Sequence, residues 1–355
     1  MFKLIDLYIA RTLLGTIAVT LSVLIGLSGM LKFVEQLRRV GQGDYDMTLA
    51  ALYVLLSLPR EVEQFLPIAT LLGGLIGMGL LAQNSELVVM QAAGMSRTGI
   101  TLSAMKSIVV VIVIMMALGE FVTPISEAKA KQLRTQALSG GSLIASDQLI
   151  WAKDGQNFVS IGEVITQNNL QDVNVYKFNE DLSLIEIMSA KSAAFVTNRW
   201  QLEGVQIIQF FDEKIVKSSP SNQQWDSTLT PDKLGIVAIK PEALSIQGLY
   251  EYVSYLQSND QDPDRYKLAF WRKVLQPLSV AVMLLVALSF IFGPLRSVTM
   301  GARTMLGVLT GFGFFASNQL FGQLSLVSPY LSPFAGAILP SIVFALIAWL
   351  LLRRH

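Results

Sequence analysis

Long apolar stretches lie at both ends of this 355-residue chain and enclose a polar middle of about 140 residues. Each stretch is about 20 residues long, enough for a helix to cross a hydrocarbon core of ~30 Å. We place the spans at 10–31, 56–81, 101–124, 270–292, 303–323 and 334–352. The chain is therefore predicted to be an α-helical membrane protein, with three spans before the polar segment and three after it.

Composition excludes several kinds of chemistry. Cysteine is missing, and the one histidine is the last residue, His355, which argues against thiol or histidine catalysis and against cysteine-based metal sites. The formal net charge of +1 indicates neither a nucleic acid nor an acidic polymer as partner. No G-x-x-x-x-G-K-[ST] phosphate loop occurs, so any ATP must be hydrolysed by another chain. We expect no catalytic residues, no metal and no cofactor in this chain.

Basic residues predict the orientation in the membrane. An alternation over six spans puts one set of them on a single side: Lys3, Arg11, Arg97, Arg296, Arg303, Arg353 and Arg354. The positive-inside rule makes that side cytoplasmic. Both termini are then cytoplasmic, and residues 125–268 lie on the opposite side.

The polar middle has the pattern of short strands. Apolar and polar residues alternate, with turn pairs between the segments, at 156–161, 173–178 and 200–205. Regular short strands without helices between them predict a sandwich or jelly roll. Residues 241–258 have helical spacing instead and should lead back to the membrane. The predicted domains are 1–137 with spans one to three, 138–240 as the β domain, 241–265 as the returning helix, and 266–355 with spans four to six.

The loop between spans two and three, residues 84–95, carries the signals of a short helix. Ser85 is expected to cap its N-terminus, and Glu86 lies where the helix dipole favours an anion. Gly94 suits a left-handed residue after the last turn. Two interpretations remain open from the residues alone: a tight connector, or a coupling helix that docks on a cytoplasmic motor.

Four stretches of the chain resemble the LptF/LptG family of lipopolysaccharide-export permeases. Residues 85–96 are similar to the family's coupling-helix motif, and the other stretches lie at 140–155, 229–235 and 276–296. The resemblance covers essentially the whole chain. It implies six spans with a periplasmic β-jellyroll, in the inner membrane of a Gram-negative bacterium. The coupling contacts that it implies here fall on Glu86, Leu87, Met90 and Gly94.

The resemblance also implies partners and a task. The chain would pair with a homologous LptF-like permease and with two LptB-like ATPase subunits that bind the ATP. It would extract lipopolysaccharide from the outer leaflet and pass it to a periplasmic bridge of LptC/LptA-like jellyroll proteins. Strand addition at a sheet edge is a suitable way to join such domains.

Charged residues follow the first span where the bilayer disfavours them. Lys32, Glu35, Gln36 and Arg39 have helical spacing and share a face if the helix continues past residue 31, whereas Arg38 points roughly 120° away. These cations lie on the outer side, against the positive-inside trend. They either snorkel to lipid headgroups or form a basic rim that grips an anionic headgroup.

A second charged face follows the third span. Glu127, Lys131 and Arg134 recur at i, i+4 and i+7, again on the outer side. Two basic faces at matching depth could line one opening.

The family resemblance assigns part of this rim. In the family, basic residues at the outer end of the first span are implicated in binding lipopolysaccharide phosphates, which matches Lys32, Arg38 and Arg39. Depth and spacing add Arg134 as a further headgroup contact. Glu35 is expected to position Lys32 or Arg39 rather than to touch the lipid.

Other polar and small residues of the spans have simpler interpretations. A group expected to open the second span and pair locally at the interface comprises Pro59, Arg60, Glu61 and Glu63. The glycines expected to permit close helix packing are Gly73, Gly74, Gly77 and Gly79.

Two other classes of protein agree less well with the sequence than an exporter does. A receptor with an outer binding domain needs fewer spans and a cytoplasmic output domain, which the short loops do not supply. An ion-coupled transporter usually carries ionisable residues near the midplane, whereas Lys106 and Glu120 lie near opposite ends of the third span.

Overall fold

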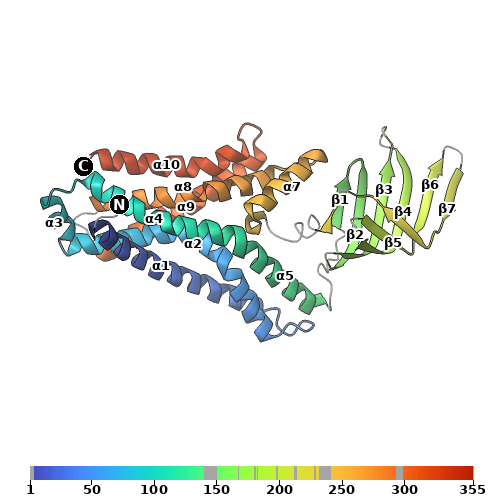
Figure 1. Cartoon of the computed structure of the whole chain (residues 1–355), viewed down its shortest axis with the longest axis horizontal. Helices are drawn as coiled ribbons and strands as arrows, with labels where there is room; N and C mark the ends of the chain where they lie inside the picture. The colour runs from blue at the N-terminus through green and yellow to red at the C-terminus, as the bar shows by residue number, and fades with distance from the viewer. Residues whose placement is uncertain are drawn as a thin grey trace.

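The computed structural model describes residues 4–139, 150–166, 168–179, 181, 183–196, 199–211, 214–227, 229–231, 241–292 and 299–354. Its two parts are a long helical bundle and a β-sheet at one end of it (Figure 1). Helix α1 begins and α10 ends at the bundle end that lies away from the sheet. The stretches of the family resemblance at 140–143, 232–235 and 293–296, and the basic residues Lys3 and Arg296, lie outside the described residues.

The helices follow the expected order along the chain. They are α1 (Leu4–Leu37), α2 (Met47–Gln83), α3 (Glu86–Ala92), α4 (Arg97–Ala117), the π-helix η1 (Leu118–Val122), α5 (Thr123–Ser139), the 3-10 helix η2 (Pro241–Ala243), α7 (Ile246–Ser258), α8 (Asp264–Phe292), α9 (Met300–Val327) and α10 (Pro333–Arg354). The returning helix predicted at 241–258 corresponds to η2 and α7.

Five helices in the described part of the chain are long and apolar enough to cross a membrane: Leu4–Leu37, Met47–Gln83, Arg97–Leu138, Asp264–Phe292 and Pro333–Arg353. The sixth expected span, 303–323, coincides with α9, which packs against α2 and α10. Its glycines and the pair Asn318 and Gln319 dilute its apolar character. The chain is thus a helical membrane protein with an inserted β domain, and its helices are longer than the predicted spans.

Helix α2 lies at the centre of the bundle and packs tightly against its neighbours. A Cβ atom on Gly73 would come 2.6 Å from the Cα of Ile17 in α1, and one on Gly74 would come 3.0 Å from the Cβ of Ala287 in α8. Thr16 donates a hydrogen bond to the Gly73 carbonyl at 2.8 Å. The prediction that these glycines permit close helix packing is confirmed, because any larger side chain would push α1 or α8 away.

The β domain is one antiparallel sheet. Its strands are β1 (Ile150–Asp154), β2 (Asn157–Thr166), β3 (Asn169–Phe178), β4 (Leu184–Val196), β5 (Arg199–Glu203), β6 (Gln206–Phe211), β7 (Lys214–Ser218) and β8 (Asn222–Trp225). The order is β1-β2-β3-β4-β5-β8, and β6 and β7 branch from β4. This happens because one edge of the long strand β4 pairs with β5 near Val196 and with β6 near Glu186. The predicted strands fall in β2, β3 and β5, and the jellyroll arrangement stays a prediction.

Helix α7 connects the sheet to the bundle. At its C-terminal end, the Tyr255 hydroxyl donates to the Lys153 carbonyl at 2.9 Å, and Asn259 accepts from the Gly155 amide at 2.8 Å. At its N-terminal end, Glu120 of η1 accepts from the Ile246 amide at 2.8 Å. The turn between β1 and β2 is therefore tied through α7 to the bundle.

Candidate functional site

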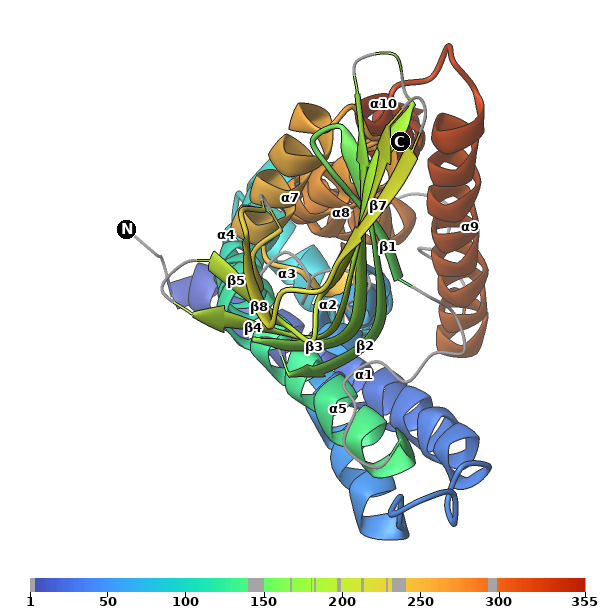
Figure 2. The same cartoon turned by 90° about the vertical axis from the view of Figure 1, so that its right-hand side faces the viewer.

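A turn joins α1 and α2 at the end of the bundle that lies on the side of the sheet. Both views place this turn beside the end of α5 (Figures 1 and 2). The Asp44 amide donates to the Ala137 carbonyl at 2.8 Å. Gly43 has φ +54°, and a Cβ there would lie 2.5 Å from the same carbonyl oxygen. The turn is thus seated on α5, which brings the two predicted basic faces to one place.

Two of the predicted cations meet around Tyr45. This phenol is buried beneath the turn. Burial raises the pKa of Tyr45, and the positive charges of Arg134 and Arg39 oppose that rise. Arg134 also lies over the Tyr53 ring, with its Cζ 5.1 Å from the ring centroid. Arg39 and the neighbouring Arg38 are exposed. The structure therefore places positive charge from α5 and from the turn after α1 at one end of the bundle. We call this end, with Arg38, Arg39 and Arg134, the mouth.

Lys32 is held by a partner on another helix. Its Nζ lies 2.5 Å from Glu61 of α2, and Ser28 donates to the same carboxylate at 2.6 Å. Of the two partners expected for Glu35, Lys32 is wrong, because Glu61 supplies its carboxylate, whereas Arg39 stays a prediction. The helix does continue past residue 31, but it ends at Leu37.

The expected common face of the first span is therefore interrupted. Gln36 is buried and accepts a hydrogen bond from the Tyr45 hydroxyl at 3.3 Å. Arg39 lies beyond the helix end in the turn. Lys32 thus contacts α2 and Gln36 faces the interior, whereas Glu35, Arg38 and Arg39 are exposed.

A layer of buried charges crosses the bundle below this mouth. Glu63 of α2 lies 3.5 Å from Lys273 of α8 and accepts a hydrogen bond from Thr123. Lys273 donates to the Leu244 carbonyl at 2.7 Å. Gly119, within the π-helix η1, leaves room for this pair, since a Cβ there would lie 2.7 Å from the Glu63 carboxylate. Four segments of the chain therefore converge on one carboxylate.

A proline explains another contact of this layer. Pro67 lies inside α2 and cannot donate to the carbonyl four residues earlier, that of Glu63. The Gln276 side chain of α8 donates to that carbonyl instead, at 2.6 Å. The proline thus frees a backbone acceptor that joins two helices.

Arg60 extends the same layer to two further segments. It lies 3.4 Å from Glu127 of α5 and 3.6 Å from Glu242 of η2. Glu127 is buried in this pair, so it is not part of an exposed face with Lys131 and Arg134. The prediction that Arg60, Glu61 and Glu63 pair locally is wrong. Helix α2 begins at Met47, and these residues bind partners on four other segments.

Helix α3 lies at the opposite end of the bundle from the sheet (Figure 1). Ser85 has φ +62° and makes no side-chain capping hydrogen bond, so the predicted cap is wrong. Glu86 accepts from the Tyr8 hydroxyl of α1 at 2.7 Å. Gly94 has φ +94°, and the Met95 amide donates to the Met90 carbonyl at 3.1 Å. The left-handed residue predicted after the last turn is confirmed.

The two faces of α3 have different environments. Leu87 is buried in the main core of the bundle, and Met90 packs against that core. Val88 and Val89 are 50% and 65% exposed. A coupling role for Leu87 and Met90 would therefore act by holding the helix on the bundle, while the valines are available to a partner. Within the described residues no cluster of histidine and acidic side chains could hold a metal ion.

Comparison with known proteins identifies the family. Residues 7–354 match the family described as "Lipopolysaccharide export system permease LptF/LptG". The lipopolysaccharide export system permease protein LptG of Escherichia coli (strain K12) is 48% identical over 357 residues, which cover 99% of each chain. The protein of the same name from Haemophilus influenzae is 43% identical over 356 residues, covering 100% of this chain and 99% of the relative. This multi-pass membrane protein therefore belongs to the LptF/LptG family of lipopolysaccharide export system permeases.

Proposed function

We propose that this chain is a permease subunit of an ATP-driven lipopolysaccharide exporter. It would take lipopolysaccharide from the outer leaflet of the inner membrane and pass it to a periplasmic bridge. The observation that carries the proposal is the seating of the turn that bears Arg38 and Arg39 on α5, the helix of Arg134, at the end of the bundle that bears the sheet. The family membership supports lipopolysaccharide as the substrate, and its phosphates are suitable ligands for such a cationic mouth.

The proposed orientation follows from this mouth. Both termini and α3 would be cytoplasmic, and the β domain would be periplasmic. The arrangement in Figure 1 supports this, because the end of α10 and helix α3 lie at the bundle end away from the sheet. A membrane-anchored receptor is the alternative, but its binding domain would have no use for a buried charge layer in the bundle.

The four predicted cations would then have separate tasks. Arg38 and Arg39 are exposed in the turn and would bind phosphate directly, since a guanidinium can donate two parallel hydrogen bonds. Arg134 is half-buried against Tyr53 and would approach the ligand from α5. Lys32 is paired with Glu61, so it would bind phosphate only in competition with that carboxylate.

Helix α3 would transmit conformational changes of the ATPase subunits to the bundle. A homologous LptF-like permease and two LptB-like ATPase subunits would complete the transporter, with ATP bound by the ATPases alone. Val88 and Val89 would contact an ATPase, and Glu86 would hold α3 to α1 through Tyr8. LptC/LptA-like jellyroll proteins would form the bridge that receives the lipid.

Charge reversal at the mouth tests the headgroup site. In the Arg38→Glu/Arg39→Glu double variant, which reverses the two exposed arginines, photo-crosslinking of lipopolysaccharide should fall more than tenfold. Each charge-assisted hydrogen bond contributes ~1.5–3 kcal/mol, so losing two exceeds one decade of affinity. Assembly with the partner permease should persist. Lys267→Glu, which changes a half-buried cation near the start of α8, is the matched control. Normal crosslinking in the double variant would refute the headgroup site.

Glu86→Ala tests the coupling role. We expect weaker co-purification of the ATPase and slower ATP-driven release of lipopolysaccharide. Tyr8→Phe removes the hydrogen bond to Glu86 without removing the charge, so it separates the positioning of α3 from direct contact. Unchanged co-purification and release in Glu86→Ala would contradict coupling through this residue. Purification of the chain in mild detergent without any ATPase would overturn the exporter itself.

A further inference from the structure

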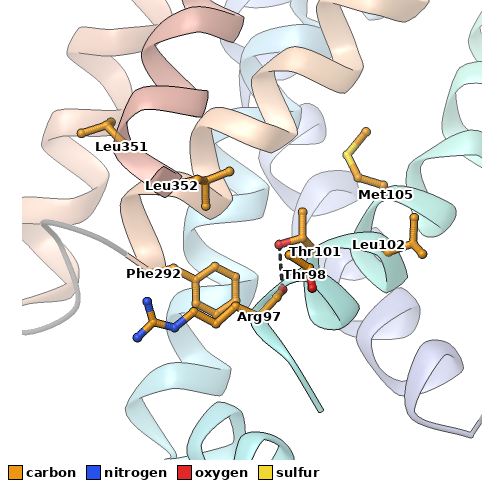
Figure 3. Close-up of a pocket in the computed structure, with 8 residues that line it drawn as sticks. All are labelled: Arg97, Thr98, Thr101, Leu102, Met105, Phe292, Leu351 and Leu352. Atoms are coloured by element: carbon orange, nitrogen blue, oxygen red, sulfur yellow. Dashed lines mark hydrogen bonds between the residues drawn. The ribbon is translucent and has the colours of Figure 1, made fainter. Parts of the chain in front are cut away.

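A groove opens between three helices at the end of the bundle away from the sheet. Its volume is about 250 Å³. The described residues that line it come from the first turns of α4 and the last turns of α8 and α10: Arg97, Thr98, Thr101, Leu102, Met105, Phe292, Leu351 and Leu352. Figure 3 shows the leucines of α10 on one side and Leu102 and Met105 on the other, with Arg97 beside Phe292.

The groove has the depth of a lipid chain. Helix α4 begins at Arg97, and α8 and α10 end at Phe292 and Arg354, so three helices terminate at this level. From Arg97 to Met105 the helix rises ~12 Å, at 1.5 Å per residue. The groove therefore runs from the membrane surface into the hydrocarbon layer.

The walls of the groove continue into surfaces that face the bilayer. On α4, Leu102 is 59% exposed and Val113, three turns further, is also 59% exposed. On α10, Leu350 is 52% exposed. Exposed apolar surface on a spanning helix is solvated by lipid chains. A lipid diffusing in the bilayer thus reaches the groove directly, whereas a water-soluble protein reaches only its rim.

The rim of the groove is positively charged. Among the described lining residues none is acidic, and Arg97 is a cation. Next to Leu352, the Arg353 guanidinium lies over the Trp349 ring at 5.2 Å, a position typical of the membrane interface. Thr98 and Thr101 add hydroxyl groups on the first turns of α4. Apolar depth with a cationic rim is the complement of a phospholipid with an anionic headgroup.

We propose that this groove binds an acyl chain of an anionic phospholipid from the cytoplasmic leaflet, with the headgroup at Arg97 and Arg353. The site is separate from the proposed headgroup site at the mouth, which lies at the other end of the bundle. Because Arg97 closely follows α3, a bound lipid lies beside the connection from α3 to α4.

Photo-crosslinking in nanodiscs tests the site on the full chain, assembled with its partners. The probes are phosphatidylglycerol and phosphatidylcholine that carry a diazirine on one acyl chain, with peptide mapping of the label. Phosphatidylglycerol should label residues 97–105 and 351–352. Arg97→Gln should reduce that labelling about fivefold, since one arginine near an anionic surface contributes ~1 kcal/mol. Thr101→Trp should abolish it by filling the groove.

A control variant on the same helix, and the other molecules that could occupy the groove, complete the test. Val113→Trp, on the exposed part of the same helix, should leave the label unchanged. Equal labelling by phosphatidylcholine would overturn the choice of an anionic lipid. Labelling that appears only after the ATPase is removed from the complex would show a protein-docking surface and overturn the site. Preferential labelling by a diazirine-bearing lipopolysaccharide would do the same, because the groove would then hold the exported lipid. Labelling of the groove does not depend on export, so it stands or falls apart from the proposed function.

Discussion

The Glu63–Lys273 pair allows a quantitative test of the buried charge layer. Both side chains are more than nine-tenths buried, with 3.5 Å between Lys273 Nζ and the carboxylate. Lys273→Met keeps the length of the side chain but removes its charge and its bond to the Leu244 carbonyl. The Glu63 carboxylate is then left with Thr123. Breaking a buried pair on one side costs ~3–5 kcal/mol, and we expect that loss in the free energy of unfolding.

Removing both charges should cost less than removing one. In Glu63→Gln/Lys273→Met no uncompensated charge remains, and the amide still accepts from Thr123. We expect the double variant to be ~2 kcal/mol more stable than the sum of the single variants predicts, which is a typical coupling for contacting residues.

The assay is reversible unfolding in mixed micelles with increasing SDS, followed by tryptophan fluorescence. Lys267→Met is a matched control, because Lys267 and Asp264 lie at the same 3.5 Å on the same helix but their side chains are 33% and 42% exposed. That variant should lose less than ~1 kcal/mol. The reasoning would be refuted if the stability losses of Glu63→Gln and Lys273→Met added up to the loss of the double variant. Equal losses in Lys267→Met and Lys273→Met would refute it as well.

Three further predictions concern single positions. Gly73→Ala should destabilise the bundle by ~1–3 kcal/mol through overpacking against Ile17, whereas Gly26→Ala, with nothing within 4 Å, should be neutral in the same SDS unfolding. Burial raises the pKa of Tyr255 from 10.0 to about 12, so the folded state retains this proton longer than the unfolded state. Its stabilising contribution is full below pH 10 and is lost as the pH rises through 12, and Tyr255→Phe should make alkaline unfolding, followed by fluorescence, less steep. Gly94→Ala should cost ~1–2 kcal/mol of local stability from its φ of +94° and speed amide exchange in α3; unchanged exchange would contradict this.

The sequence was sufficient for the layout of the chain, because hydropathy acts over windows of about 20 residues. It underestimated helix lengths, since helices continue through polar residues beyond the bilayer. Helix α1 runs to Leu37, and the helix that begins at Arg97 continues through η1 to Ser139. These helix extensions determine the geometry of the site, because they bring Lys32 into contact with Glu61 and Arg134 into contact with Tyr53.

The partners of the charges could not be predicted from spacing. Glu63 and Lys273 are distant in the chain and meet only through the packing of α2 on α8. One local signal was available: Pro67 leaves the Glu63 carbonyl without its helical donor, which indicates a side-chain contact near this point. The capping error at Ser85 has a similar cause. A capping serine needs an extended backbone, which Ser96 adopts when it accepts from the Gly99 amide at 3.0 Å.

Helix α2 joins the two ends of the proposed transport machinery. It leads into α3 at one end and follows the turn with Tyr45 at the other. Between them, Glu61 binds α1, Arg60 binds α5 and η2, and Glu63 binds α8. A displacement of α3 along α2 must therefore move these segments together or break ion pairs, of which Glu63–Lys273 is buried on both sides and costs several kcal/mol to break. Moving together costs far less, so the charge layer makes α2 a stiff connection of ~30 Å from Glu63 to the end of the bundle that bears α3.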